Sequence, residues 1–140
     1  MNWIVAKIKW LMLLSGALTC TMFYAAIAPQ AALQSNFGEV LEGSVAEIVV
    51  RNWGALIGLV GAMLIYGAYH PPSRPLVLTV ASLSKLTFVG LVLVNGQQYL
   101  SRQVGIAVIV DSVWVLLFIG YFIGVRNRQP ASAGMGALGR

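Results

Sequence analysis

Two charged residues, Lys85 and Asp111, each stand alone inside a long apolar run of the sequence. An isolated charge is costly to hold in such surroundings, so it indicates either a structural ion pair or a functional site. Three interpretations remain open: a buried ion pair that aligns two helices, a polar ligand site, and two residues that never meet. As a ligand site, the pair would bind a proton, a head group or a small polar molecule, in a cavity lined also by Ser82, Ser84, Thr87 and Asn95.

A second polar group comprises Glu47, Arg51 and Trp53, at the start of another apolar run. Arg51 and Trp53 could bind a phosphate or carboxylate head group at the outer membrane boundary. Alternatively, Arg51 lies one helical turn after Glu47 and pairs with it as an interface anchor. The sequence leaves both interpretations open.

Metal and redox chemistry find little support in the sequence. Glu39 and Glu42 could share a cation, but no third ligand is evident and a solvated loop is the alternative. His70 has no acidic or cysteine neighbour, and Cys20 is the only cysteine, for which we expect a packing role. Phosphate loops, nucleophile elbows and haem motifs are missing from the sequence. We therefore expect no metal, no cofactor and no catalytic residue.

The composition places these residues in a membrane. Hydrophobic residues make up 59% of the 140 residues and charged residues only 9%, whereas about a quarter of the residues of soluble domains are charged. At about 20 apolar residues per crossing, this length allows four helices and no separate soluble domain. The net charge of +5 comes from basic residues scattered at the ends of apolar segments, so we expect no nucleic-acid binding.

The sequence predicts an all-α, up-down bundle of four transmembrane helices in a single domain, 1–128. Pro29, the proline-rich turn 70–75 and the polar turn 96–103 separate the apolar runs. Ser44 and Glu47 fit a capping box at the start of the second helix. The helices are expected at about 10–28, 45–69, 76–95 and 104–125, and a flexible cytoplasmic tail over 129–140.

The longest polar stretch, 30–43, lies between the first two helices. Its larger apolar residues recur at helical spacing, which is consistent with a short amphipathic helix on the outer surface, and an irregular loop is an equal alternative. They are Leu33, Phe37, Val40 and Leu41.

Small residues repeat along one face of two predicted helices. Glycines at such spacing let another helix approach closely. We expect them to serve packing within the chain, with a dimer interface as the alternative. They are Gly54, Gly58 and Gly61 in the second helix, and Gly120 and Gly124 in the fourth.

The basic residues predict the orientation. Arg51 and Arg102 fall on one side of the predicted bundle, and the larger set falls on the other. The positive-inside rule then places both termini in the cytoplasm, and in a bacterium the membrane is the inner one. The larger set is Lys7, Lys9, Arg74, Arg126, Arg128 and Arg140.

Several short stretches, taken in order, resemble the small bacterial four-helix membrane proteins of the DoxX-like and DUF4345-like groups. The resemblance runs from the second helix onward and implies a compact four-helix bundle, sometimes working beside redox or quinone-linked membrane enzymes. It implies no established catalytic residue, and these proteins often have an arginine where this chain has Lys85. The stretches are Arg51-Asn52-Trp53-Gly54, Arg74-Pro75-Leu76, Ser84-Lys85, Asn95-Gly96 and Asp111.

Two functions of different class follow. The first is a non-catalytic accessory or assembly subunit that packs against a larger, redox-linked or other membrane complex. The alternative is a protein that binds or transports a small molecule, lipid or quinone at a polar site around Lys85 and Asp111. The expected partners are membrane lipids and other integral membrane proteins or copies of the chain.

Overall fold

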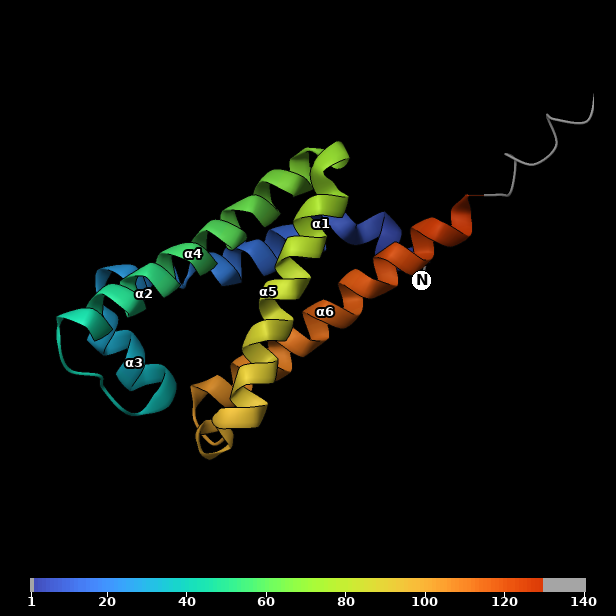
Figure 1. Cartoon of the computed structure of the whole chain (residues 1–140). Helices are drawn as coiled ribbons and strands as arrows, with labels where there is room; N and C mark the ends of the chain where they lie inside the picture. Colours follow the sequence, from blue (N-terminus) through green and yellow to red (C-terminus); the bar gives the residue numbers. More distant parts are fainter. Residues whose placement is uncertain (1, 130–140) are drawn as a thin grey trace, which may run out of the picture.

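The computed structural model describes residues 2–129, and within that range all regular structure is helical. Of the tail expected over 129–140, only Gln129 lies inside the described residues. Figure 1 shows α1 lying along α4, and α5 running from the end of α4 to the turn that leads into α6. The elements are α1 (Asn2–Cys20), α2 (Phe23–Ile27), α3 (Pro29–Phe37), α4 (Ser44–Tyr69), η1 (Pro71–Ser73), α5 (Arg74–Asn95), η2 (Gln97–Tyr99) and α6 (Gln103–Arg128).

Four helical segments within the described residues are long and apolar enough to cross a membrane. Each has 25 or 26 residues, which corresponds to about 39 Å of helix and exceeds the roughly 30 Å of a hydrocarbon core. Large apolar side chains such as Ile27 and Val94 point outward, with 78% and 77% of their surface exposed. So much apolar surface suits hydrocarbon rather than water, and the chain is a membrane protein by this composition. The segments are Asn2–Ile27, Ser44–Tyr69, Pro71–Asn95 and Gln103–Arg128.

The first of these segments is broken. It starts at Asn2, earlier than the expected residue 10, and its helix is interrupted at Thr21 and Met22. The Thr19 hydroxyl donates a hydrogen bond to the Ser15 carbonyl at 2.7 Å, and the Met22 amide bonds back to Thr19 in a tight turn. Threonine hydroxyls that bond to the preceding turn bend helices, so α2 leaves α1 at this point.

The second helix, α4, begins at Ser44, but the capping box predicted there was wrong. The residue before the helix is Gly43, with φ 102°, and no side chain caps the helix. The Glu47 carboxylate accepts a hydrogen bond from Arg51 instead. A charged partner one turn away competes successfully for this carboxylate.

The segment 30–43 forms α3 followed by a loop. The helix ends at Gly38, whose left-handed φ of 74° is the usual helix terminator. Ala32 and Leu33 are buried, and α3 contacts both α4 and α6, so it is folded against the bundle rather than only resting on its surface. The ring of Phe37 packs edge-on against Tyr99 at 5.3 Å.

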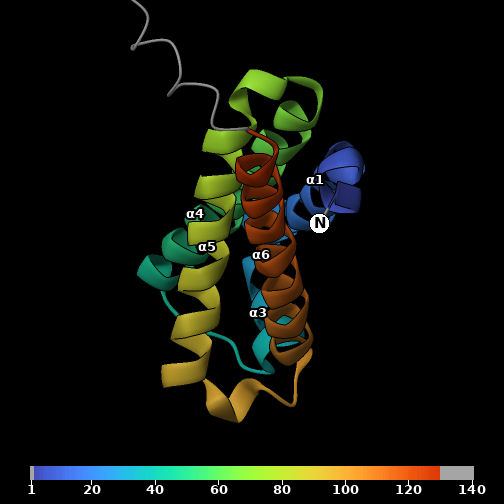
Figure 2. The ribbon, with the colours of Figure 1, turned by 90° about the vertical axis from the view of Figure 1, so that its right-hand side faces the viewer.

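Within residues 2–129, two separate apolar clusters form the core. The smaller one, near the turn between α5 and α6, is built around Val92, Val104 and Val108. Figure 2 shows α5 and α6 side by side, and Lys85 and Asp111 lie on them between the two clusters. The larger cluster comprises Ile8, Met12, Leu64, Ala68, Val77, Leu78, Ala81, Trp114 and Phe118.

The glycines of α4 lie where the first segment approaches most closely. A β-carbon on Gly61 would come within 2.6 Å of the Cys20 amide nitrogen, and one on Gly58 would meet the ring of Phe23. A β-carbon on Gly54 would come within 2.7 Å of Ala25. This glycine face therefore serves packing within the chain, and Cys20 takes part in that contact.

The glycines of α6 are also inside the structure. A β-carbon on Gly120 would lie 2.8 Å from the Ile4 side chain, and Gly124 is buried. Gly120 therefore lies at the contact between α1 and α6, where only the flexible end of the Ile4 side chain would have to move for a larger residue.

Candidate functional site

Lys85 and Asp111 form a buried ion pair between α5 and α6. The Lys85 ammonium donates a hydrogen bond to Asp111 Oδ1 and a longer one, 3.4 Å, to the Thr19 hydroxyl. The Lys85 side chain is 7% exposed and that of Asp111 is 20% exposed. The pair therefore joins three helices, because Thr19 lies on α1.

The chain brings the two residues to similar depth through the short turn that joins α5 to α6. Lys85 lies ten residues before Asn95, where α5 ends, and Asp111 lies eight residues after Gln103, where α6 begins. At 1.5 Å per residue these positions are roughly 15 Å and 12 Å from the turn. A flexible lysine stem spans the difference.

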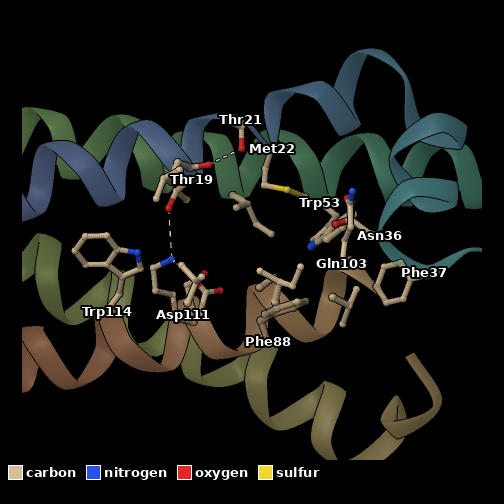
Figure 3. A pocket seen from close by; sticks show the side chains of 18 residues that line it. Thr19, Thr21, Met22, Asn36, Phe37, Trp53, Phe88, Gln103, Asp111 and Trp114 are labelled. Carbon is tan, nitrogen blue, oxygen red and sulfur yellow. Dashed lines mark hydrogen bonds and ion pairs between the residues drawn. The ribbon is translucent and has the colours of Figure 1, made fainter. Parts of the chain in front are cut away.

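A cavity of about 420 Å³ lies beside the ion pair. Figure 3 shows Thr19 opposite Asp111 and Trp114 across one end of it, and Phe37 with Trp53 toward the other end. The lining is mostly apolar and rich in aromatic rings. The aromatic residues are Phe37, Trp53, Phe88 and Trp114; the polar ones, besides the pair, are Thr19, Thr21, Asn36, Ser84 and Gln103.

The two ends of the cavity differ. Trp114, which belongs to the larger apolar cluster, closes the end near the ion pair. The break between α1 and α2 and the packed helix α3 supply Met22, Asn36 and Phe37 at the other end. The cavity thus exists because the first segment bends away from α6 after Thr19.

Of the residues that the sequence predicted around the pair, some line the cavity and others do not. Ser84 lines the cavity, whereas the buried Ser82 hydroxyl has no hydrogen-bond partner among the described residues. Thr87 is exposed, and its hydroxyl bonds to the Leu83 carbonyl of its own helix at 2.8 Å. Two residues at about 100° each place Thr87 on the helix face opposite to Lys85, so it does not join the site.

Asn95 does not join the site either. It lies ten residues beyond Lys85 at the end of α5, and it lines a separate hollow of about 280 Å³. At 1.5 Å per residue it is roughly 15 Å further along the helix axis. The polar cavity expected from the sequence therefore keeps only Ser84 of its flanking residues, together with the pair.

Glu47, Arg51 and Trp53 do not form one site. Arg51 pairs with Glu47 at 2.7 Å and also donates to the carbonyl of Ala26 at 2.7 Å and of Ile27 at 3.2 Å. These donors satisfy backbone groups at the end of α2, which is a structural role. Trp53 is half-buried and lines the cavity, 6.4 Å from the ring of Phe37.

Several residues that line the cavity were not predicted from the sequence. Thr19 looks like any small residue in an apolar run, and Trp114 like any core aromatic. Asn36 and Gln103 stand in polar stretches where they read as solvated loop residues. No local pattern distinguishes them, because their common feature is the cavity they face.

The described part of the chain holds no cluster of metal-ligating side chains. Within residues 2–129, no three histidine, cysteine, aspartate or glutamate side chains gather closely enough to hold an ion. Glu39, one of the two outer glutamates, accepts a hydrogen bond from the Tyr99 hydroxyl at 2.9 Å. That bond ties the loop after α3 to the turn between α5 and α6.

The chain matches no protein-family model, no curated protein and no solved structure. The resemblance to DoxX-like and DUF4345-like proteins therefore stays a prediction. The chemistry of the site follows from its own residues: an ion pair of zero net charge at one end of an apolar cavity.

Proposed function

We propose that this protein binds a small lipophilic molecule inside the bundle, with the polar end of the molecule at Lys85 and Asp111. One observation carries the proposal: the ion pair lines an apolar cavity instead of being sealed by packing. A cavity of about 420 Å³ falls within the roughly 300–1,000 Å³ of ligand sites, which are typically apolar with a few polar groups that orient the ligand.

The bilayer is the proposed source of the ligand. Two cavity residues on opposite helices, Leu18 of α1 and Ile106 of α6, are 49% and 65% exposed on the outer surface. Exposed apolar side chains at the edge of a cavity in a membrane protein face hydrocarbon. A lipophilic molecule would therefore enter sideways, between α1 and α6, without crossing water.

We place the protein in a bacterial inner membrane as an up-down bundle with both termini in the cytoplasm. A hydrogen bond of 3.5 Å from Arg128 to the Asn2 carbonyl brings the two ends of the described chain together. Lys9 lies over the ring of Tyr69, 4.6 Å from its centre, at the same end. Basic residues concentrated at one end support a cytoplasmic location for that end.

The accessory-subunit function remains a second candidate, favoured by the outer face of α5. Gly90 lies there with open space where its β-carbon would be, among exposed side chains such as Leu86 and Leu93. A small residue on a lipid-facing surface allows another helix to pack closely. The partner would be another integral membrane protein or a second copy of the chain.

Two variants, each with an alanine replaced by phenylalanine, test the binding proposal. Ala107→Phe fills the cavity, whereas Ala62→Phe adds the same side chain on an exposed face of α4. The purified proteins, in lipid nanodiscs, are extracted with organic solvent and the extracts are analysed by mass spectrometry. We expect one lipophilic compound to be enriched with the wild type and with Ala62→Phe, and to be lost from Ala107→Phe.

The same preparation separates the two candidate functions. Equal extracts from all three proteins would overturn the binding proposal. Co-purification of a larger membrane complex with all three proteins, without an enriched small molecule, would favour the accessory subunit.

A further inference from the structure

The charges around the cavity balance. Among the described residues that line it, Lys85 and Asp111 are the only charged ones, and they neutralise each other. A charged ligand group would meet one like and one opposite charge at nearly the same distance, so its net Coulomb attraction would be small. That attraction would not offset the cost of removing the group from water. The cavity therefore favours an uncharged polar group.

The ion pair keeps hydrogen-bonding groups that no residue of the described chain uses. The Lys85 ammonium has three donors, and Asp111 and Thr19 take two of them. Asp111 uses Oδ1 for Lys85, and its other carboxylate oxygen has no hydrogen-bond partner among residues 2–129. The pair thus offers one donor and one strong acceptor at the end of the cavity.

A hydroxyl group matches this pattern. Its proton is donated to the free oxygen of Asp111 while its oxygen accepts from Lys85, so both charged groups are satisfied at once. An ether or a ketone only accepts and leaves the carboxylate oxygen unmatched. A carboxamide also matches both groups, because a carboxylate oxygen accepts more than one hydrogen bond, but it brings a larger desolvation cost into an apolar cavity.

From these observations we infer that the ligand is an uncharged amphiphile whose polar end is a hydroxyl group, either an alcohol or a phenol. This inference rests on the proposed binding function and narrows it to one chemical class. The apolar body of the ligand lies among Phe88, Trp53 and Phe37, toward the end of the cavity away from Trp114. The aromatic lining suits a ring or a chain equally.

The test uses probes that share one alkyl chain and differ in the head group: dodecanol, dodecanoate, dodecylammonium and dodecyl methyl ether. Octylphenol is the phenol counterpart. Binding is measured by calorimetric titration of protein in nanodiscs at mildly alkaline pH, where the acid is ionised. Nanodiscs that hold Ala107→Phe give the background of partitioning into lipid.

For the wild type we expect dodecanol or octylphenol to bind about tenfold more tightly than the two charged probes and the ether, as a hydrogen bond to a charged group allows. The tighter of the two hydroxyl probes identifies the subclass. If the ether binds as tightly as dodecanol, or a charged probe binds more tightly, the hydroxyl inference is overturned and cavity binding stands. If no probe binds above the Ala107→Phe background, the proposed binding function itself fails.

Changes to the pair give an independent check on the charge argument. Asp111→Asn leaves a net cation, so the preference should move to dodecanoate. Lys85→Met leaves a net anion and should move the preference to dodecylammonium. The double change Lys85→Met with Asp111→Leu, which keeps the site neutral, should bind dodecanol no better than the ether. Unchanged preference in all three variants would show that the ligand head lies elsewhere and would overturn the inference.

Discussion

Removal of one member of the Lys85–Asp111 pair should cost more stability than removal of both. The informative set is Lys85→Met, Asp111→Leu and the double variant. Each replacement is apolar and similar in volume to the residue that it replaces. The single variants leave an uncompensated charge, whereas the double variant leaves none.

The structure sets the order of the effects. Asp111→Leu leaves an ammonium that is 7% exposed with only the Thr19 hydroxyl at 3.4 Å, so we expect a loss near the top of the range of about 3–5 kcal/mol for a broken buried pair. Lys85→Met leaves a carboxylate that is 20% exposed beside the cavity, so it is less tightly enclosed by protein than the ammonium. Its loss should lie at the lower end, about 3 kcal/mol.

The double variant should lie within about 1 kcal/mol of the wild type, since apolar replacement of a buried pair is often neutral. The coupling energy, which is the combined loss of the two single variants less that of the double variant, would then be about 7 kcal/mol. Single interhelical hydrogen bonds in a membrane protein average about 0.6 kcal/mol, so the difference is measurable and specific to charge.

Reversible unfolding in mixed micelles, with dodecyl sulfate as denaturant and helix content followed by circular dichroism, gives these free energies. Thr87→Val is the matched control, because Thr87 is exposed on the opposite face of the same helix and should leave stability nearly unchanged. If the double variant is less stable than either single variant, the pair does not act as a unit and the reasoning is refuted.

Three further results are expected. Gly61→Ala places a carbon within 2.6 Å of the Cys20 backbone and should destabilise the protein by about 1–3 kcal/mol in the same unfolding assay. Gly90→Ala, which has open space around it, should leave stability unchanged or raise it by up to about 1 kcal/mol through helix propensity; equal effects of the two variants would contradict the packing described. Arg51→Met removes hydrogen bonds to the Ala26 and Ile27 carbonyls and should lower stability by about 1–2 kcal/mol. Glu47→Gln weakens only an exposed ion pair and should lower stability by about 0.5 kcal/mol or less; the reverse order would show that the ion pair dominates. In bacterial cells, a phosphatase that is active only outside the cytoplasm should be active when inserted in the 38–43 loop and inactive when fused to either terminus, and activity at one terminus alone would exclude an even number of crossings.

The helical class and the approximate helix limits were predictable from the sequence. Apolar runs of membrane-spanning length, separated by prolines and polar turns, are local properties that need no knowledge of neighbours. The start of α4 at Ser44 and its end at Tyr69 lie within a residue of the expected limits. The capping box at Ser44 failed because Glu47 had a competing partner in Arg51.

The site was predictable only in part. The depth of Lys85 and Asp111 follows from counting residues along two consecutive helices. Whether the two side chains point toward each other depends on how each helix is rotated about its axis. That rotation is a result of packing, and it also turns Thr87 away and leaves Asn95 beyond reach. Counting along the helix therefore correctly places residues in depth and fails to say which of them meet.

The amino-acid sequence by itself determined the four helices that are long and apolar enough to cross a membrane and the two charges within them, since hydrophobicity and helix length act locally. Only the tertiary structure decided that Thr19 reaches Lys85, that α1 breaks at Thr21, and that α3 folds inward to leave a cavity beside the pair. The physical reason is that a cavity is the space left over after distant segments have packed. Its shape depends on contacts between residues far apart in the chain, such as Gly61 with Cys20 and Phe37 with Tyr99.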